Sequence, residues 1–395
     1  MARSARRVCV VTGSRAEYGQ LSWLLREMQD DPAFDVQLVV TGAHLAPQFG
    51  MTRDEILGDG MAIKAEVDLL IAGDSARAIA KSLGVGVIGF ADTFSWLQPD
   101  VVLLAGDRFE TLAAAQAAMM LRIPIAHIAG GEVTEGAIDE SIRHAITKMA
   151  HLHFVAAEPY ARRVIQLGES PDRVFVVGAL GLESVRRIEP LDRAAVEQAL
   201  GIPLRQPLFL VTYHPVTVVH DSAAGVEELI AALSDFSEAV VVQTGVNADS
   251  GNDAIAQTFA AYAARHPAQV VSRASLGQRL YLSTMRYADV LVGNSSSGLV
   301  EAPAIGVPTV NIGDRQAGRL RAASVIDCVA ERAAIRTAIK AALAPEFRAA
   351  ARRQNSLYGD GFTAGRIKDF LKTIDLNGIL LKQFHDLPMS GAALL

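Results

Sequence analysis

Hydrophobic runs of strand length alternate with amphipathic stretches along nearly the whole chain. Apolar positions spaced by three and four residues, such as Leu21, Leu24 and Met28, indicate a helix between two such runs. We predict strands at 7–12, 35–41, 101–106, 123–128, 152–156, 173–178, 207–213, 239–244, 269–272, 289–293 and 308–312. The alternation of strands with helices is typical of parallel sheets that are covered by helices on both faces.

The charged segment 183–206 has no strand pattern and separates two groups of these repeated units. We therefore predict an α/β protein with two Rossmann-like domains facing a cleft. The N-terminal domain is expected at residues 1–185 and the C-terminal domain at 186–365. A last helix pattern runs from Ile367 to Leu380, and we expect residues 366–395 to pack back on the N-terminal domain.

Residues 84–89 read GVGVIG and match a dinucleotide-binding pattern by letter. That pattern requires a strand before it and a helix that opens after it, whereas the preceding AIAKSL is helical. We predict small residues in a closely packed helix and no dinucleotide site.

The stretch 77–99 is apolar around much of its circumference, so one face is left for a second subunit, which predicts a homodimer or homotetramer.

Composition bounds the class of protein. The 395 residues exceed what one core usually supports, and the net charge of −6 argues against a non-specific nucleic-acid binder. Cys9 and Cys328 lie in apolar runs, which favours free thiols in a reducing compartment. Because no uncharged apolar run is long enough to span a membrane, we expect a cytoplasmic protein without a membrane partner. No Cys/His set has zinc spacing, so we predict no metal site.

Charged side chains directly follow three strands of the first half. Arg15 comes after a strand-end glycine, where a guanidinium and backbone N–H groups can bind an anion. His44 follows the second strand and can bind a sugar hydroxyl or a phosphate. Asp107 and Arg108 follow the strongest apolar run, at the end where open α/β sheets bind ligands. If these loops face away from the ligand, the same residues are instead exposed turn residues or members of a surface ion pair.

A loop at 130–137 carries Glu132 and leads into a helix. Its expected apolar stripe consists of Ile138, Ile142, Ala145 and Met149. Asp139 and Arg143 are four residues apart, so they share a helix face and can pair. A helix-terminal charge is the alternative interpretation of Asp139, since carboxylates are favoured in the first turn, but it explains Glu132 and Asp139 less well if the loop faces the cleft.

The second half carries hydroxyl and amide groups after its strands. Ser295 and Ser296 directly precede a helix expected to open at 299–301, where hydroxyls and N–H groups suit a diphosphate, and Glu301 can accept two ribose hydroxyls. His214 and Asn247 each follow a strand, and Arg315 follows another on the same edge of the sheet. A plain serine cap explains one of these serines but not the whole run.

Taken in order, these motifs resemble the hydrolysing UDP-N-acetylglucosamine 2-epimerases. The resemblance spans roughly residues 7–370 and rests on GSRAEYG, TGAHL, GDRFE, HIAGGE, IDESIRHAITKMAHLHF, HPVT, GNSSSGLVEAPAIGVP and NIGDRQAGR. It implies the glycosyltransferase-B architecture, with the nucleotide on the C-terminal domain and sugar chemistry on the N-terminal one. That family supplies N-acetylmannosamine, or a 2,4-diacetamido-trideoxy analogue, for sialic and legionaminic acid synthesis, without a cofactor.

The resemblance also implies roles for individual residues. The nucleotide side comprises His214, Asn247, Ser295, Ser296, Glu301 and Arg315. The sugar side comprises Arg15, His44, Asp107, Arg108, Glu132, Asp139 and Arg143, and proton transfer is assigned to Asp107, Glu132 and Asp139. Many relatives carry a glutamate where this chain has Ala129, whose methyl group cannot transfer a proton. Either another carboxylate, Glu132 first, replaces it, or this branch handles a different sugar.

The expected reaction is elimination of UDP to a glycal, followed by hydration to the free manno sugar. Two carboxyl groups on opposite faces of the sugar are the minimum for this chemistry. Three alternatives stay open from sequence: a non-hydrolysing epimerase, a glycosyltransferase of the same fold, and a nucleotide-sugar sensor without catalysis.

Overall fold

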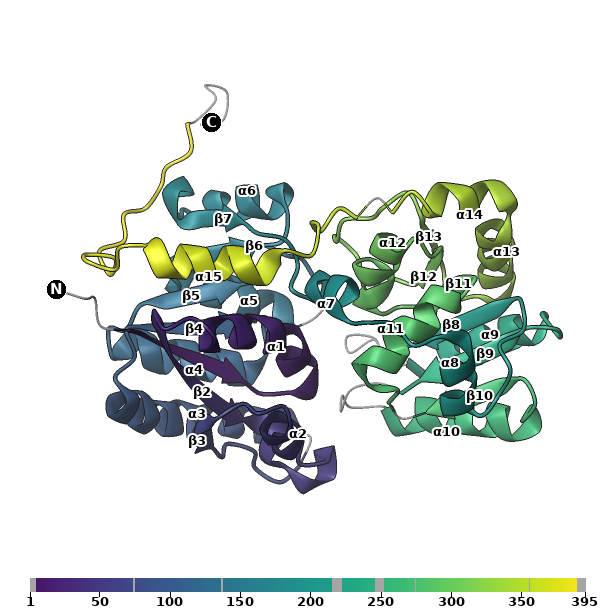
Figure 1. Cartoon of the computed structure of the whole chain (residues 1–395), viewed down its shortest axis with the longest axis horizontal. Helices are drawn as coiled ribbons and strands as arrows, with labels where there is room; N and C mark the ends of the chain where they lie inside the picture. Colours follow the sequence, from purple (N-terminus) through teal and green to yellow (C-terminus); the bar gives the residue numbers. More distant parts are fainter. Residues whose placement is uncertain are drawn as a thin grey trace. The chain divides into compact units, whose positions relative to one another are not determined.

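The computed structural model describes residues 5–73, 75–135, 138–214, 222–245, 252–273, 275–354 and 356–388. The chain divides into two compact units. Unit 1 comprises Met1–Glu132, Ile138–Glu183 and Gly361–Leu395, and unit 2 comprises Val133–Ala137 and Ser184–Asp360. Each unit is a parallel sheet with helices on both faces (Figure 1).

Unit 1 has a parallel sheet in the order β3-β2-β1-β4-β5-β6-β7. Its strands are β1 (Arg6–Thr12), β2 (Phe34–Thr41), β3 (Ile63–Val67), β4 (Val101–Ala105), β5 (Ile125–Ile128), β6 (Leu152–Val155) and β7 (Val174–Val176). Its helices are α1 (Arg15–Gln29), α2 (Arg53–Gly58), α3 (Ala76–Leu97), α4 (Phe109–Met120), α5 (Ile138–Met149), α6 (Glu158–Gln166) and α15 (Thr363–Thr373), and α7 (Gly181–Arg187) crosses into unit 2.

Alternate residues of each strand in unit 1 face two different cores. Val8 and Val10 of β1 belong to the core under α1 and α15, whereas Cys9 and Val11 belong to the core under α3 and α4. The C-terminal helix α15 lies beside α1 in Figure 1, and its buried Leu371 fills the first of these cores. A continuous apolar strand with buried residues on both faces is what a parallel sheet requires.

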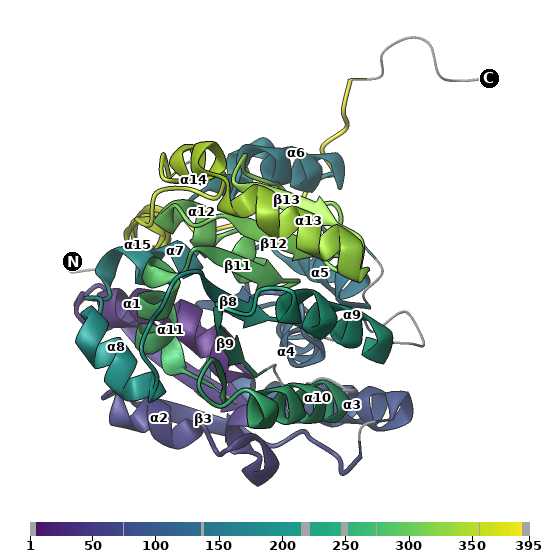
Figure 2. The ribbon, with the colours of Figure 1, turned by 90° about the vertical axis from the view of Figure 1, so that its right-hand side faces the viewer.

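Unit 2 repeats the same plan in the order β10-β9-β8-β11-β12-β13. Its strands are β8 (Leu208–Thr212), β9 (Val240–Thr244), β10 (Val270–Arg273), β11 (Val290–Gly293), β12 (Thr309–Ile312) and β13 (Val325–Cys328). Its helices are α8 (Arg193–Leu200), α9 (Ser222–Ser234), α10 (Asn252–Arg265), α11 (Gly277–Tyr287), α12 (Glu301–Ile305), α13 (Arg332–Leu343) and α14 (Pro345–Ala351). Helices α9 and α13 lie side by side on one face (Figure 2), and α8, α11 and α12 cover the other.

The structure confirms every strand predicted from the sequence to within two residues at either end. It adds β3, an edge strand of the sheet in unit 1, and β13, an edge strand of the sheet in unit 2. Both strands contain exposed polar residues. The GVGVIG stretch lies inside α3, as expected. A Cβ at Gly86 would lie 3.0 Å from Ala113 Cβ, and one at Gly89 would lie 2.7 Å from Val67 Cγ1, so small residues are needed there.

Two helix predictions were wrong in detail. The last helix ends at Thr373 and does not continue to Leu380. The stripe expected on α5 is only half right: Ile142 and Met149 pack against the core, whereas Ile138 is 76% exposed and Ala145 is exposed. The most buried residues are Arg143, Ile146 and Thr147, and the apolar pattern does not reveal the buried arginine.

Among the described residues, the structure contains no helix with both the length and the apolar character needed to cross a membrane.

Candidate active site

Most predicted site residues follow strands at the point where the strand order of each sheet reverses. In unit 1 the strand order reverses between β1 and β4, and in unit 2 between β8 and β11. Ligands of open α/β sheets bind at the carboxyl ends of the strands at such a reversal. Arg15 and Asp107 follow β1 and β4, and His214 and Ser295 follow β8 and β11. The fold thus brings the predicted residues of each unit to its own reversal point.

A buried arginine holds Asp107 in place. Gly106, at φ +78°, turns the chain directly after β4 and places Asp107 at the edge of the sheet with 24% of its side chain exposed. The Arg143 guanidinium is 1% exposed and donates to Asp107 Oδ2, to Glu140 Oε2 at 2.7 Å and to the carbonyl of Glu132 at 2.9 Å. Because a buried guanidinium must be paired, these contacts fix the Asp107 carboxylate.

A neutral histidine supports the same turn. Burial lowers the pKa of His127 to about 4. Its Nε2 lies 2.8 Å from the carbonyl oxygen of Gly106, and its Nδ1 lies 3.2 Å from Thr147 Oγ1. A carbonyl oxygen only accepts hydrogen bonds, so Nε2 carries the proton and donates it. His127 therefore ties β5 to the loop that presents Asp107.

A pair of glutamates lies beside the β1–α1 turn. Arg108 donates to both carboxylate oxygens of buried Glu110, at 3.3 Å each. Glu17 Oε2 accepts from the N–H groups of Gly13 at 2.7 Å and Ser14 at 3.1 Å, while Oε1 is buried without a hydrogen-bond partner among the described residues. Burial and the Glu110 carboxylate raise the pKa of Glu17 to about 7, against the lowering influence of Arg108.

Arg15 and His44, two further residues predicted on the sugar side, differ in their exposure to solvent. Arg15 begins α1, and its half-exposed guanidinium pairs with Glu55 at 3.1 Å. His44 is fully buried, with Nε2 3.0 Å from Thr12 Oγ1 and Nδ1 2.8 Å from Thr52 Oγ1. Burial lowers the pKa of His44 to about 4, so the ring is neutral. His44 supports the loop after β2, and its direct contact with a ligand stays a prediction.

The turn after β5 contains a strained residue. Ala129 has φ +67°, a left-handed conformation that costs a non-glycine residue about 1–2 kcal/mol. Its N–H donates to the carbonyl of Phe154 at 3.0 Å, which holds the turn in place. Glu132 is buried three residues later, and Asp139 is partly buried in the first turn of α5. Both predicted carboxylates therefore flank the segment that follows this turn.

In unit 2 an asparagine side chain joins the two strand ends at the reversal point. Gly293 has φ +143°, and a Cβ there would lie 1.9 Å from the carbonyl oxygen of Thr212, so only glycine fits. Buried Asn294 accepts from His214 N–H at 2.6 Å and donates to the His214 carbonyl at 2.8 Å. Burial and then Arg315 lower the pKa of His214 to about 3. Its Nδ1 is buried without a partner among the described residues.

The serine run forms one tight turn. The Ser295 hydroxyl accepts from the N–H of Ser297 at 3.3 Å and caps the 3₁₀ turn Ser296–Gly298. The α-helix predicted to open at 299–301 begins at Glu301, as expected, and has five residues. Burial raises the pKa of the partly buried Glu301 carboxyl. The turn offers hydroxyl and N–H groups to an anion just before the short helix α12.

Arg315 approaches this turn from the loop after β12. Its NH1 donates to the Asn294 carbonyl at 3.1 Å, and Gln316 Nε2 donates to the same oxygen at 2.9 Å. Arg315 thus lies next to the serine turn within unit 2. The remaining predicted nucleotide residue, Asn247, lies outside the described residues.

Sequence reasoning missed four residues that shape the site of unit 1: Glu17, Glu110, His127 and Glu140. One of them had a readable signal, because Ser14 followed by Glu17 is a capping box, and the structure shows both of its hydrogen bonds. Glu140 and Glu110 pair with Arg143 and Arg108 at local spacings, which the sequence also contains but does not mark as part of a site. His127 differs, because it contacts Gly106 and Thr147 on other elements, and no local pattern identifies such contacts.

Comparison with known proteins identifies the family. The family model described as UDP-N-acetylglucosamine 2-epimerase matches residues 26–372. A Campylobacter jejuni protein described as a GDP/UDP-N,N'-diacetylbacillosamine 2-epimerase (hydrolyzing) is 38% identical over 386 residues, 97% of this chain and 100% of that protein. Escherichia coli polysialic acid biosynthesis protein P7 is also 38% identical, over 97% of this chain and 98% of its own.

The fold also matches solved structures. The crystal structure of UDP-GlcNAc 2-epimerase from Neisseria meningitidis bound to UDP-GlcNAc has a TM-score of 0.79 at 18% identity, and the match covers 92% of this chain and 99% of that one. At this identity the likeness concerns the fold, and it confirms the predicted class of two parallel-sheet α/β domains.

The Glu17 carboxyl predicts a specific pH dependence of stability. Between its ordinary pKa of 4.5 and about 7, Glu17 is protonated when folded and ionised when unfolded. Its stabilising contribution is therefore complete below pH 4.5 and is lost as the pH rises through 7. Glu17→Gln mimics the protonated form, so its free energy of unfolding should rise relative to the original protein by roughly 1–3 kcal/mol between pH 5 and 8.

Urea denaturation of both proteins at several pH values measures this difference. Glu158→Gln, which changes an exposed glutamate on α6, is the matched control and should give a difference that is constant with pH. A constant difference for Glu17→Gln as well would show that Glu17 is ionised in the folded protein near neutrality.

Proposed function

Because the chain belongs to the UDP-N-acetylglucosamine 2-epimerase family, we propose that it is a hydrolysing nucleotide-sugar 2-epimerase. Its substrate is UDP-N-acetylglucosamine or UDP-2,4-diacetamido-2,4,6-trideoxyglucose, and its products are UDP and the free manno sugar. The 38% identity to a relative described as a hydrolysing diacetylbacillosamine epimerase supports the hydrolytic reaction and favours the diacetamido sugar. The equal identity to a polysialic acid biosynthesis protein keeps the N-acetyl sugar as the other candidate.

The observation that carries the proposal is Asp107, a partly exposed carboxylate fixed by a buried guanidinium at the reversal point of unit 1. A general acid or base must be held in a fixed orientation while its proton-accepting oxygen stays accessible. The contact from Arg143 and the turn held by His127 meet the first requirement. The exposed part of the carboxylate meets the second.

The reaction begins with elimination, because no carbonyl acidifies the C2 hydrogen of the sugar. The C1–O bond to the diphosphate breaks, and its electron pair leaves with UDP. A carboxylate takes the C2 proton, and the electrons of the C2–H bond form the C1=C2 double bond of a glycal. Hydration follows: an acid returns a proton to C2 from the opposite face, and water adds to C1 and gives up a proton to a carboxylate.

The carboxylates of unit 1 divide this work. We assign Asp107 to one face of the sugar and Glu132 or Asp139 to the other, and the balance of protons is the same whichever of them is the base. Arg15 and Arg108 are the remaining basic groups at this edge for binding the sugar or its leaving group. Arg143 and His44 are buried, and we propose that both act as positioning residues.

The nucleotide is assigned to unit 2. Neutral His214 has a buried ring nitrogen, Nδ1, without a partner among the described residues, and the serine turn offers hydroxyl and N–H groups for the diphosphate. Arg315 contributes positive charge that stabilises the leaving diphosphate. Ser295, Ser296 and Glu301 complete the set described here, together with the predicted contact from Asn247.

Product analysis in deuterated water tests the proposal. The protein should convert one of the two UDP sugars to free UDP and a manno sugar that carries deuterium at C2, because the C2 proton returns from solvent. Nuclear magnetic resonance of the products measures both the configuration and the label. The UDP sugar that is converted faster identifies the substrate of this branch of the family.

Each alternative gives a different product in the same experiment. A deuterated UDP-linked manno sugar would identify a non-hydrolysing epimerase, and an unlabelled sugar on an added acceptor would identify a glycosyltransferase. Binding of UDP without any turnover of either sugar would identify a sensor. Any of these outcomes would contradict the hydrolytic reaction.

We also propose that the protein forms homodimers or homotetramers through α3. Val85, Ile88 and Trp96 lie on one side of this helix and are exposed, Trp96 to 70%, with polar Asp92 between Ile88 and Trp96 and Lys81 one turn before Val85. Exposed apolar side chains in this number are typical of a subunit interface.

Light scattering should therefore give at least twice the 42.0 kDa chain mass at micromolar concentration. Trp96→Asp should reduce this mass to that of one chain, because it places a charge in the interface. Leu57→Asp, a matched change at an exposed position of α2, should leave the mass unchanged. A single-chain mass for the unaltered protein would refute this interface.

A cytoplasmic location is likewise our proposal. Both cysteines are free thiols in the structure, as the reducing cytoplasm requires. Fractionation of cells that express the protein measures its location directly.

A further inference from the structure

A cavity of about 260 Å³ lies in unit 2, away from the proposed nucleotide site. Its walls come from the segments that precede β8, β11 and β12, together with α8, α11 and α14. The proposed nucleotide residues follow the other ends of the same strands. Because β8 has five residues, the two regions are separated by about 16 Å along the sheet.

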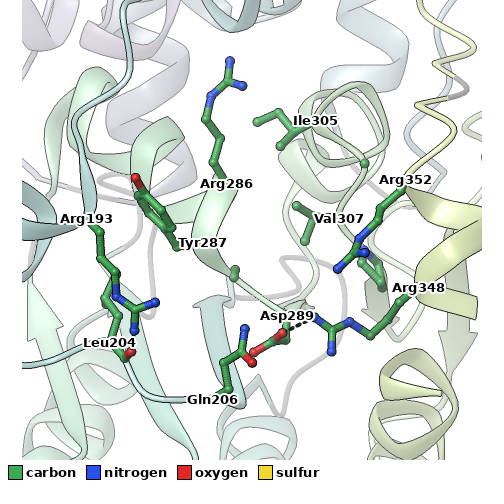
Figure 3. A pocket seen from close by; sticks show the side chains of 13 residues that line it. Arg193, Leu204, Gln206, Arg286, Tyr287, Asp289, Ile305, Val307, Arg348 and Arg352 are labelled. Carbon is green, nitrogen blue, oxygen red and sulfur yellow. Dashed lines mark hydrogen bonds and ion pairs between the residues drawn. The ribbon is translucent and has the colours of Figure 1, made fainter. Parts of the chain in front are cut away.

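Arginine side chains dominate this cavity (Figure 3). The guanidinium groups of Arg193, Arg348 and Arg352 point toward its interior, whereas that of Arg286 points away. Arg286 instead donates to the carbonyl of Val185 at 2.9 Å. Three guanidinium groups that converge on one space create a strongly positive site.

Two of the three arginines are held in place by the protein. Arg348 donates to buried Asp289, whose other oxygen accepts the N–H of Leu208 at 2.8 Å. Arg193 pairs with Glu197 at 3.1 Å and donates to the Leu204 carbonyl. These contacts use only part of the five N–H donors of each guanidinium. Both groups are therefore oriented in advance and keep donors for a ligand.

The third arginine, Arg352, is unpaired within the described part of the chain. The side chain of Arg352, at the end of α14, makes no hydrogen bond or ion pair with the described residues. Asp289 is the one carboxylate that lines the cavity, and both of its oxygens are already used. When the negative charges of Asp289 and Glu197 are subtracted from the positive charges of the three arginines, a net positive charge is left in the cavity. An anion is the ligand that would complete it.

We propose that this cavity is a binding site for a phosphate group, either free or at the end of a small phosphomonoester. Planar guanidinium groups bind phosphate oxygens through paired hydrogen bonds, and a phosphate has more oxygens than a carboxylate with which to accept hydrogen bonds from several arginines. Tyr287, Ile305 and Val307 supply an apolar wall beside the arginines, against which the body of an ester can pack. The proposal is independent of the reaction proposed above.

Calorimetric titration of the full-length protein with inorganic phosphate and with glucose 6-phosphate tests this site. Saturating UDP is present throughout, so that the proposed nucleotide site is occupied. Phosphate should bind to the UDP-saturated protein, and Arg352→Ala should weaken that binding about tenfold or more. Tighter binding of glucose 6-phosphate would identify the ester as the source of the phosphate group, and equal binding would identify free phosphate.

Arg353→Ala is the matched control, since Arg353 is the next residue, is exposed and does not line the cavity. It removes the same charge and should leave phosphate affinity unchanged. Arg352 supports no other described side chain, so its loss should not affect melting. The proposal would be overturned by absence of phosphate binding, by equal effects of the two substitutions, or by acetate binding as tightly as phosphate. Failure of UDP to bind would count against the proposed function alone, because the phosphate titration can be repeated without UDP.

Discussion

The ion pairs of Arg143 are the interaction on which the catalytic half of the structure depends. A guanidinium that is 1% exposed costs several kcal/mol of desolvation unless its N–H groups are paired. Here they connect the start of α5, the loop after β4 and the segment after β5, through Glu140, Asp107 and the Glu132 carbonyl. Removing one partner would leave part of this buried charge without compensation. The orientation of Asp107 is therefore a consequence of how α5 packs on the sheet.

Unit 2 joins the strand ends at its reversal point through an amide side chain and not through a carboxylate. The Asn294 amide bonds both the N–H and the carbonyl of His214, and so joins the ends of β8 and β11 with two neutral hydrogen bonds. A site for a polyanionic nucleotide benefits from neutral supports, since a carboxylate there would repel the diphosphate. A site for proton transfer needs carboxylates and a cation to hold them. The different chemistry assigned to the two units thus follows the different supports at their reversal points.

The strand pattern made the fold predictable, because buried parallel strands are continuous apolar runs. Edge strands β3 and β13 were missed because one side of each is exposed and carries polar residues. Site residues that follow strands, such as Asp107 and His214, could be found from sequence for the same reason. The buried face of α5 could not, because its central residue is an arginine whose partners are distant in the chain.

The role of individual carboxylates also depends on surroundings that the sequence does not show. Glu17 reads as a simple helix cap, yet burial next to Glu110 raises its pKa to about 7. Ala129 reads as a lost catalytic position, yet it holds a left-handed turn that leads to Glu132. In both cases the sequence identifies the position of the residue, whereas its contacts with elements distant in the chain determine its chemistry.

A double-mutant cycle between Arg143 and Asp107 tests the central claim most directly. Arg143→Lys keeps the positive charge but loses the multiple contacts, and Asp107→Asn removes proton transfer, which typically contributes about 10²–10⁴-fold in rate. If Arg143 acts through Asp107, kcat/KM of the double variant should lie within about threefold of that of Asp107→Asn alone. Losses that multiply, with normal melting of all three variants, would contradict this account, because Arg143 would then contribute to catalysis independently of the carboxylate it holds.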